Sequence, residues 1–359
     1  MNPRTLLTRP WIWGFLAALL VWLVILAVSG QGGGQTVSLA LSLAPYLIVV
    51  GIGQMLVVTA GPGNIDVSVG PVISLAGFVS VGATASTGSV VLGILAGIAA
   101  GLAVAAVSSV AILGLSVPPI IATLASGLVA SSCTLALAEG FTALPDPGLR
   151  HLLNLRPAGI PLPAVAVAAL TVLTVLLLRG TTYGRSLTAV GQNARAAERA
   201  GVPVTRVVAA TYLASGALAG LTGALLATYI APTPDLGTRY LLDSIAVVVI
   251  GGTLISGGRA VPVGVWGGAL FFILLDGLVN LVGWSTAAQN LLKGCLVLFV
   301  LFLAGGGSRR PGPAPSRTRH RPPSGPPPHT FPTSTTPTSA TPTSTTPTST
   351  ATTEGQTHG

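Results

Sequence analysis

The chain has 359 residues, of which only 7% are charged and 50% are hydrophobic. Ordinary soluble domains carry about 25% charged residues, so this composition excludes a fold with a water-exposed surface. The net charge of +9 does not indicate nucleic-acid binding, because the basic residues lie between long apolar runs and near the C-terminus.

The apolar runs predict an all-α polytopic membrane protein with about ten transmembrane helices. A helix needs roughly 20 mainly apolar residues to cross the bilayer. The eighth run is the shortest, and its end near Gly257 and Gly258 is poorly marked. The candidate spans are residues 11–29, 39–60, 66–86, 89–115, 118–138, 162–179, 207–231, 241–257, 262–283 and 288–304.

The first run has two interpretations. Arg4 and Arg9 precede it, and Ala27 with Ser29 would suit a signal-peptide cleavage site. The apolar segment of a signal peptide is only about 7–15 residues long, which is shorter than this run. The length favours an uncleaved membrane anchor, and cleavage is the alternative.

The apolar pattern breaks at residues 61–63 and restarts near Asp66. Asp66 could cap the third span by accepting hydrogen bonds from free backbone N–H groups. Alternatively, a broken helix at membrane depth could line a solute path, a reading that is compatible with the first. The candidate pathway residues are the polar side chains Gln54, Asn64, Asp66, Ser68, Asp276 and Asn280.

Asp276 and Lys293 are the two ionisable residues that the sequence places deep in the last two spans. Counted from the predicted turn near Ser285, their depths differ by roughly 5 Å at 1.5 Å per residue. A charge at that depth needs a partner or an exit to water. The two residues therefore pair, or Lys293 extends toward the interface and Asp276 lines the pathway alone.

The Arg-rich loop 180–206 contains a predicted short helix. Asn193 can cap it, residues 194–200 are good helix formers, Gly201 can end it, and Pro203 blocks its continuation. Such a helix lies either in solvent and lipid headgroups or against a partner protein.

The basic residues predict that both termini are cytoplasmic, because cytoplasmic loops of membrane proteins are enriched in Lys and Arg. The outer loops then carry only Arg150, Arg156 and Arg239, while Lys293 lies inside a span. The inner loops and termini carry Arg4, Arg9, Arg179, Arg185, Arg195, Arg199, Arg206, Arg259, Arg309, Arg310, Arg317, Arg319 and Arg321.

The sequence shows no catalytic, metal or cofactor motif. A phosphate-binding Walker A loop ends in Lys followed by Ser or Thr. The only lysine here, Lys293, is followed by Gly294, and the histidines form no cluster with cysteine. We therefore expect a protein that is not an enzyme and has no ATPase of its own.

Three segments, in this order along the chain, resemble the membrane subunits of bacterial ABC importers of the ribose type: GNIDVSVGPVISLAG (63–77), AVGQNARAAERAGVPV (189–204) and LDSIAVVVIGGTLISGGRAVPVGVWGGAL (242–270). The resemblance spans roughly residues 40–304. It implies a transmembrane permease domain, residues 1–304, that imports a monosaccharide or a similar small polar solute across the cytoplasmic (inner) membrane. The family includes permeases for ribose, rhamnose, xylose, galactose and autoinducer-2. The sequence does not show which of these solutes this chain transports.

The resemblance also implies partners. These are cytoplasmic ABC ATPase subunits, an extracytoplasmic solute-binding protein and a second permease subunit, identical or different. The predicted loop helix would be the ATPase-coupling element, with the residues Asn193, Arg195, Glu198, Arg199 and Gly201. The alternatives are an ion-coupled secondary transporter or channel without an ATPase, and a membrane scaffold that transports nothing. Secondary transporters usually carry several deep ionisable residues, whereas here only Asp276 and Lys293 are expected to lie deep.

Residues 305–359 form a separate region, first basic and then rich in Pro, Ser and Thr, which predicts a disordered cytoplasmic tail. From residue 311 onward the only large apolar side chain is Phe331, so this segment has almost nothing to bury. We expect a chain truncated after Arg310 to insert and transport like the full-length chain. Loss of transport at unchanged membrane abundance would contradict this prediction.

Overall fold

The computed structural model describes residues 10–29 and 33–306. Within these ranges the chain forms helices and no strands, which confirms the expected all-α polytopic class. The elements in chain order are α2 (Pro10–Ser29), α3 (Gly33–Thr59), α4 (Val69–Thr87), α5 (Val90–Gly114), α6 (Pro119–Ala138), α7 (Pro147–Asn154), η1 (Pro157–Gly159), α8 (Leu162–Gly180), α9 (Thr182–Gln192), α10 (Ala194–Arg199), α11 (Val204–Tyr229), α12 (Thr238–Ile250), α13 (Pro262–Leu281) and α14 (Thr286–Gly306). Residues 307–359, nearly all of the expected tail, lie outside the described residues, so the boundary at residue 304 stays a prediction.

Eight helices of the described part are long and apolar enough to cross a membrane: α2, α3, α4, α5, α6, α8, α11 and α13. Helix α14, with 21 residues, contains the whole of the expected tenth span, 288–304. Helix α12 has only 13 residues. At 1.5 Å per residue it is about 20 Å long, shorter than the roughly 30 Å of hydrocarbon that a full span must cross.

The prediction of an eighth span over residues 241–257 is therefore wrong for residues 251–257, because α12 ends at Ile250. Gly252, Gly257 and Gly258 have positive φ angles, a backbone region that glycine adopts without steric cost. The chain turns there and enters α13 through the loop 251–261. The expected third span begins later than predicted, at Val69 instead of residue 66.

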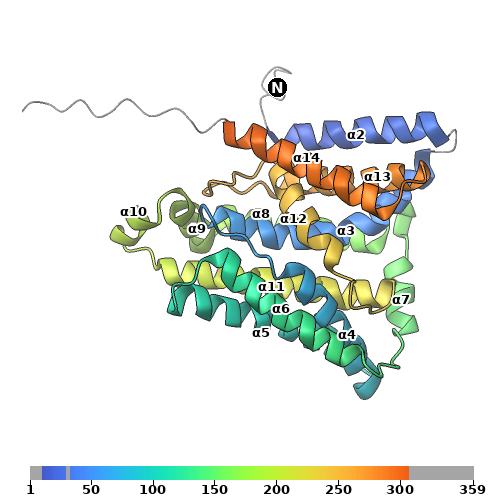
Figure 1. The fold of residues 1–359 in the computed structure, drawn as a ribbon, viewed down its shortest axis with the longest axis horizontal. Coiled ribbons are helices and arrows are strands. Elements are labelled where there is room, and N and C mark those ends of the chain that lie inside the picture. Colours follow the sequence, from blue (N-terminus) through green and yellow to red (C-terminus); the bar gives the residue numbers. More distant parts are fainter. Residues whose placement is uncertain (1–9, 30–32, 307–359) are drawn as a thin grey trace, which may run out of the picture. The chain divides into compact units, whose positions relative to one another are not determined.

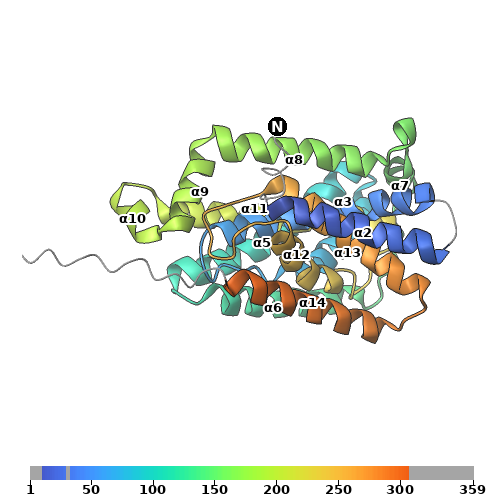
Figure 2. The same ribbon diagram turned by 90° about the horizontal axis from the view of Figure 1, so that it is seen from above.

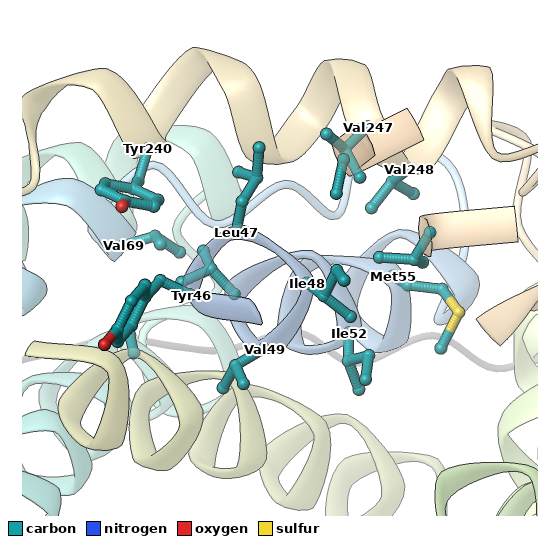
Figure 3. Packing of buried hydrophobic residues seen from close by; sticks show 14 of the residues in the cluster. Tyr46, Leu47, Ile48, Val49, Ile52, Met55, Val69, Tyr240, Val247 and Val248 are labelled. Atoms are coloured by element: carbon teal, nitrogen blue, oxygen red, sulfur yellow. The ribbon is translucent and has the colours of Figure 1, made fainter. Parts of the chain in front are cut away.

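Helix α3 forms the centre of the core, and nearly every residue from Ala40 to Thr59 is buried. Such a helix, apolar on all sides, is typical of one surrounded by other helices. It packs against α11, α13, α12 and α8. Figure 3 shows its side chains, among them Leu47 and Ile52, beside Val69 of α4 and Val247 of α12.

Helices α4, α5 and α11 pack at backbone distance. A Cβ atom on Gly101 would overlap the carbonyl oxygen of Gly216, and one on Gly220 would lie 2.5 Å from the carbonyl oxygen of Gly97. Small residues of this kind let helices approach closely in a membrane, where packing replaces the hydrophobic effect as the main attraction between helices.

The short helices lie at two ends of the long ones. Helices α9 and α10 project together at one end, with α10 packed on α9 and α11, and α7 packs on α8 and α11 at the other end (Figures 1 and 2). We call these the α10 end and the α7 end.

Candidate functional site

The segment 60–68 joins α3 to α4 without helical structure and carries the buried Asp66. One carboxylate oxygen of Asp66 accepts from the backbone N–H of Ser68 at 3.0 Å and from the Ser68 hydroxyl at 2.6 Å. The other oxygen accepts from the Ser215 hydroxyl of α11 at 2.8 Å. Asp66 does not occupy the N-cap position of α4, which is Ser68. Asp66 lies two residues before this N-cap, and its carboxylate accepts three hydrogen bonds, two from Ser68 and one from Ser215.

Side chains of the neighbouring helices also satisfy the backbone around Asp66. The Gln54 amide, oriented so that both its atoms find partners, donates to the Asp66 carbonyl oxygen at 3.2 Å and accepts from the Asp66 N–H at 3.3 Å. The Thr123 hydroxyl of α6 accepts from the Val67 N–H at 3.1 Å. Non-helical backbone at membrane depth is tolerated where protein groups satisfy it, as they do here.

Asn64 follows the turn with which this segment begins. Its side-chain oxygen accepts from the Tyr212 hydroxyl at 3.0 Å, and its side-chain nitrogen donates to the Gly61 carbonyl oxygen at 3.4 Å. Asn64 is partly exposed, whereas Gln54, Asp66 and Ser68 are buried between helices. The pathway role of these four residues stays a prediction and requires the helices around them to separate.

We expect Asp66→Ala to destabilise the protein more than Ser215→Ala does. Removing the carboxylate leaves three buried donors without their acceptor, and each unsatisfied group costs about 1–3 kcal/mol. Ser215→Ala removes only one donor. Thermal unfolding of the purified variants in detergent measures the difference. Ser132→Ala is the control, because this exposed hydroxyl bonds only within its own helix. Equal midpoints for Asp66→Ala and the control would contradict the prediction.

A second polar group consists of Arg239 and Asp243 of α12, Asp276 of α13 and Lys293 of α14, and we call it the charge cluster. The Lys293 ammonium lies 2.7 Å from Asp276 Oδ1 and 3.0 Å from Asp243 Oδ2. The Arg239 guanidinium pairs with the other oxygen of Asp276. The predicted pair of Asp276 and Lys293 is confirmed, and the cluster as a whole is neutral.

The expectation that only Asp276 and Lys293 lie deep is wrong. Asp243 and Asp66 are also buried, with relative exposures of 4% and 2%. Arg239 is the outward member of the charge cluster, since half of its side chain is exposed. Asp243 is missed because its lysine partner, Lys293, lies 50 residues away, and a single sequence does not show that the two face each other.

A cavity of about 130 Å³ lies beside the charge cluster and is lined by Arg239, Asp276 and Asn280 together with mainly apolar residues of α3 and α13. Asn280 also accepts from the Gln289 side-chain amide at 2.7 Å. The structure thus divides the predicted pathway residues into two groups. Asp276 and Asn280 share this cavity, whereas Gln54, Asn64, Asp66 and Ser68 surround the 60–68 segment.

The predicted short helix of the Arg-rich loop is present as α10. The Asn193 side chain accepts from the Ala196 N–H at 3.0 Å, as an N-cap does. At the other end Gly201 has a φ of 84° and donates to the Glu198 carbonyl oxygen at 2.9 Å. Arg195, Glu198 and Arg199 are exposed. Of the residues in α10, Ala197 is the buried one, so the helix presents most of its surface outward.

No group of three or more His, Cys, Asp or Glu side chains that could hold a metal ion occurs in residues 10–29 and 33–306. The two polar groups consist of buried hydrogen bonds and ion pairs between helices. Interrupted helices whose freed backbone is satisfied inside the bundle are a feature of transport proteins. The fold and these sites define a multi-pass membrane protein of the transport class.

The comparisons with known proteins give the family. A family model described as "Branched-chain amino acid transport system / permease component" matches residues 36–301, and the chain belongs to this family. No solved structure matches.

Several curated relatives align with this chain over most of their length. The ribose import permease protein RbsC of Bacillus subtilis (strain 168) is 35% identical over 67% of this chain and 76% of that protein. RbsC of Escherichia coli (strain K12) is 30% identical over 71% of this chain and 81% of its own. The autoinducer 2 import system permease protein LsrC of Enterobacter sp. (strain 638) is 30% identical over 84% and 88%.

Proposed function

We propose that this chain is the membrane-spanning permease subunit of an ABC importer for a monosaccharide or a similar small polar solute. The observation that carries the proposal is the similarity to two ribose import permeases across two thirds or more of the chain. The family match covers the 60–68 segment, α10 and the charge cluster. In this reading the chain is not an enzyme, and a partner protein hydrolyses ATP.

The proposed partners contact the two ends of the bundle. Helix α10, capped and exposed, is the contact for a cytoplasmic ABC ATPase subunit. The α7 end then faces the outside of the cytoplasmic membrane and receives solute from an extracytoplasmic binding protein. This orientation places both termini and most arginines in the cytoplasm, as the distribution of basic residues favours. A second permease subunit, identical or related, completes the assembly.

The substrates named for the relatives indicate the chemical class of the solute. Relatives are named as permeases for ribose and, in Haemophilus influenzae, for xylose, both of which are small hydroxylated molecules. Such a solute needs hydrogen-bonding groups along its path. Asp276 and Asn280, which line the cavity beside the charge cluster, are the candidate contacts on the α7 side.

Transport by the reconstituted complex tests the proposal. The full chain, its ATPase and its binding protein are placed in liposomes with labelled D-ribose or D-xylose. We expect uptake of at least one sugar that requires both ATP and the binding protein. Uptake by the chain alone, driven by a proton or sodium gradient, would instead establish the secondary transporter. Failure of both sugars under both conditions would contradict a pentose permease.

A further inference from the structure

Three parts of the chain meet backbone to backbone at the α10 end. A Cβ atom on Gly191, near the end of α9, would overlap the carbonyl oxygen of Thr59 and the backbone nitrogen of Gly258. The Gly258 N–H donates to the same Thr59 oxygen at 2.9 Å. A Cβ atom on Gly257 would lie 2.5 Å from the Gly61 Cα and 2.9 Å from the Gly191 carbonyl oxygen. We call Gly61, Gly191, Gly257 and Gly258 the glycine junction.

Each loop that enters the glycine junction leads to one of the two polar groups. On one side, the Gly61 carbonyl oxygen accepts from the Asn64 N–H at 3.2 Å, and Asp66 follows two residues later. On the other side, the loop 251–261 is the continuation of α12, which carries Arg239 and Asp243 of the charge cluster. A displacement of α9 at this point would therefore push on both segments that interrupt the membrane helices.

The glycine junction lies next to α10 along the chain. Only Gln192 and Asn193 separate Gly191 from the first residue of α10. The Tyr183 hydroxyl at the start of α9 is hydrogen-bonded to the Thr211 hydroxyl of α11 at 2.9 Å. Tyr212, the next residue of α11, bonds Asn64. Both ends of α9 thus contact elements that hold the 60–68 segment.

We propose that the glycine junction transmits a displacement of α10 to the 60–68 segment and to α12 at the same time, with Gly191 as the positioning residue. The inference rests on the proposed function, because it takes α10 to be the part that the ATPase moves. Backbones in direct contact transmit a displacement without the slack of flexible side chains, since packed interiors hardly compress. The junction would open or close both polar groups in one step.

Gly191→Ala tests the proposal in the full reconstituted complex. Its methyl group would separate α9 from the two loops. Coupling between sites is typically worth 5- to 150-fold, so we expect sugar taken up per ATP hydrolysed to fall by about tenfold or more. ATP hydrolysis and membrane abundance should stay near wild type. Gly180→Ala, at the end of α8, is the matched control, because a Cβ atom there meets nothing within 4 Å. A Gly191→Ala complex with the wild-type ratio of uptake to hydrolysis would overturn the proposal.

Hydrogen exchange of the wild-type complex gives a second test that does not depend on the variant folding. On ATP binding, peptides covering 57–64 and 252–260 should change protection together with those covering α9 and α10. A change confined to α9 and α10 would overturn the junction. The two proposals fail differently, since a wild-type complex without ATP-dependent uptake defeats the proposed function, whereas normal wild-type uptake with an unchanged Gly191→Ala ratio defeats only the junction.

Discussion

Replacing Lys293 with Met is expected to be among the most destabilising single changes in the chain. Lys293 lies within 3.0 Å of one oxygen of Asp243 and one of Asp276, and all three side chains are largely buried. The variant leaves Asp243 without its cation. Removing one partner of a buried ion pair costs about 3–5 kcal/mol, because the remaining charge is desolvated and uncompensated. The midpoint of thermal unfolding in detergent measures the loss, with the exposed Arg150→Gln as a charge-removing control.

Two double variants separate a four-membered cluster from an isolated pair of Asp276 and Lys293. Asp243→Asn with Lys293→Met removes one charge of each sign and keeps the contact between Arg239 and Asp276, so we expect it to recover most of the loss. Asp276→Lys with Lys293→Asp is also neutral. It places the introduced lysine beside Arg239 and the introduced aspartate beside Asp243, so we expect no recovery. Recovery by this exchanged pair would contradict the cluster.

Ala197→Pro is expected to abolish transport while the protein still inserts. The Ala197 N–H donates to the Asn193 carbonyl oxygen at 2.9 Å, the first hydrogen bond of α10. Proline removes this donor and its ring clashes with that carbonyl, at a cost of about 3 kcal/mol. A helix of six residues does not survive that loss. Uptake should fall at least about tenfold, the factor that corresponds to 1.4 kcal/mol, while ATP hydrolysis continues without it.

Ala194→Pro is the matched control in the same helix. Ala194 is the first residue of α10, where the backbone N–H has no partner within a helix and proline is favoured. Asn193 before it is extended, with φ −162° and ψ 99°, and so lies outside the α region that a following proline disfavours. We expect uptake close to wild type. Equal loss in both variants, or normal uptake by Ala197→Pro, would contradict the role of α10.

The features that the sequence predicted correctly depend on local chemistry. The apolar runs predict most of the spans because the bilayer sets their length. The capped helix α10 is predicted because Asn193 and Gly201 act within a few residues of themselves. The pair of Asp276 and Lys293 is predicted because a short turn joins their two spans. The depth of each residue in the membrane can then be estimated by counting residues from that turn.

The features that the sequence did not predict depend on contacts between distant parts. Asp66 and Ser215 are separated by 149 residues, and Asp243 and Lys293 by 50. Nothing local to Asp243 indicates a lysine opposite. Helix α9, TYGRSLTAVGQ, contains two glycines. One of them, Gly191, is required by two backbones that approach it from elsewhere.

The glycine contacts between α4, α5 and α11 have a mechanical consequence. Helices that touch through their backbones cannot slide or rotate against each other without overlap, so α4, α5 and α11 move as one rigid unit. Helix α12 is too short to span the bilayer, and the loop 251–261 joins it to α13. Spectroscopic labels on α4, α5 and α11 therefore provide a fixed reference. The distance from these labels to a label on α12 then measures the displacement of α12.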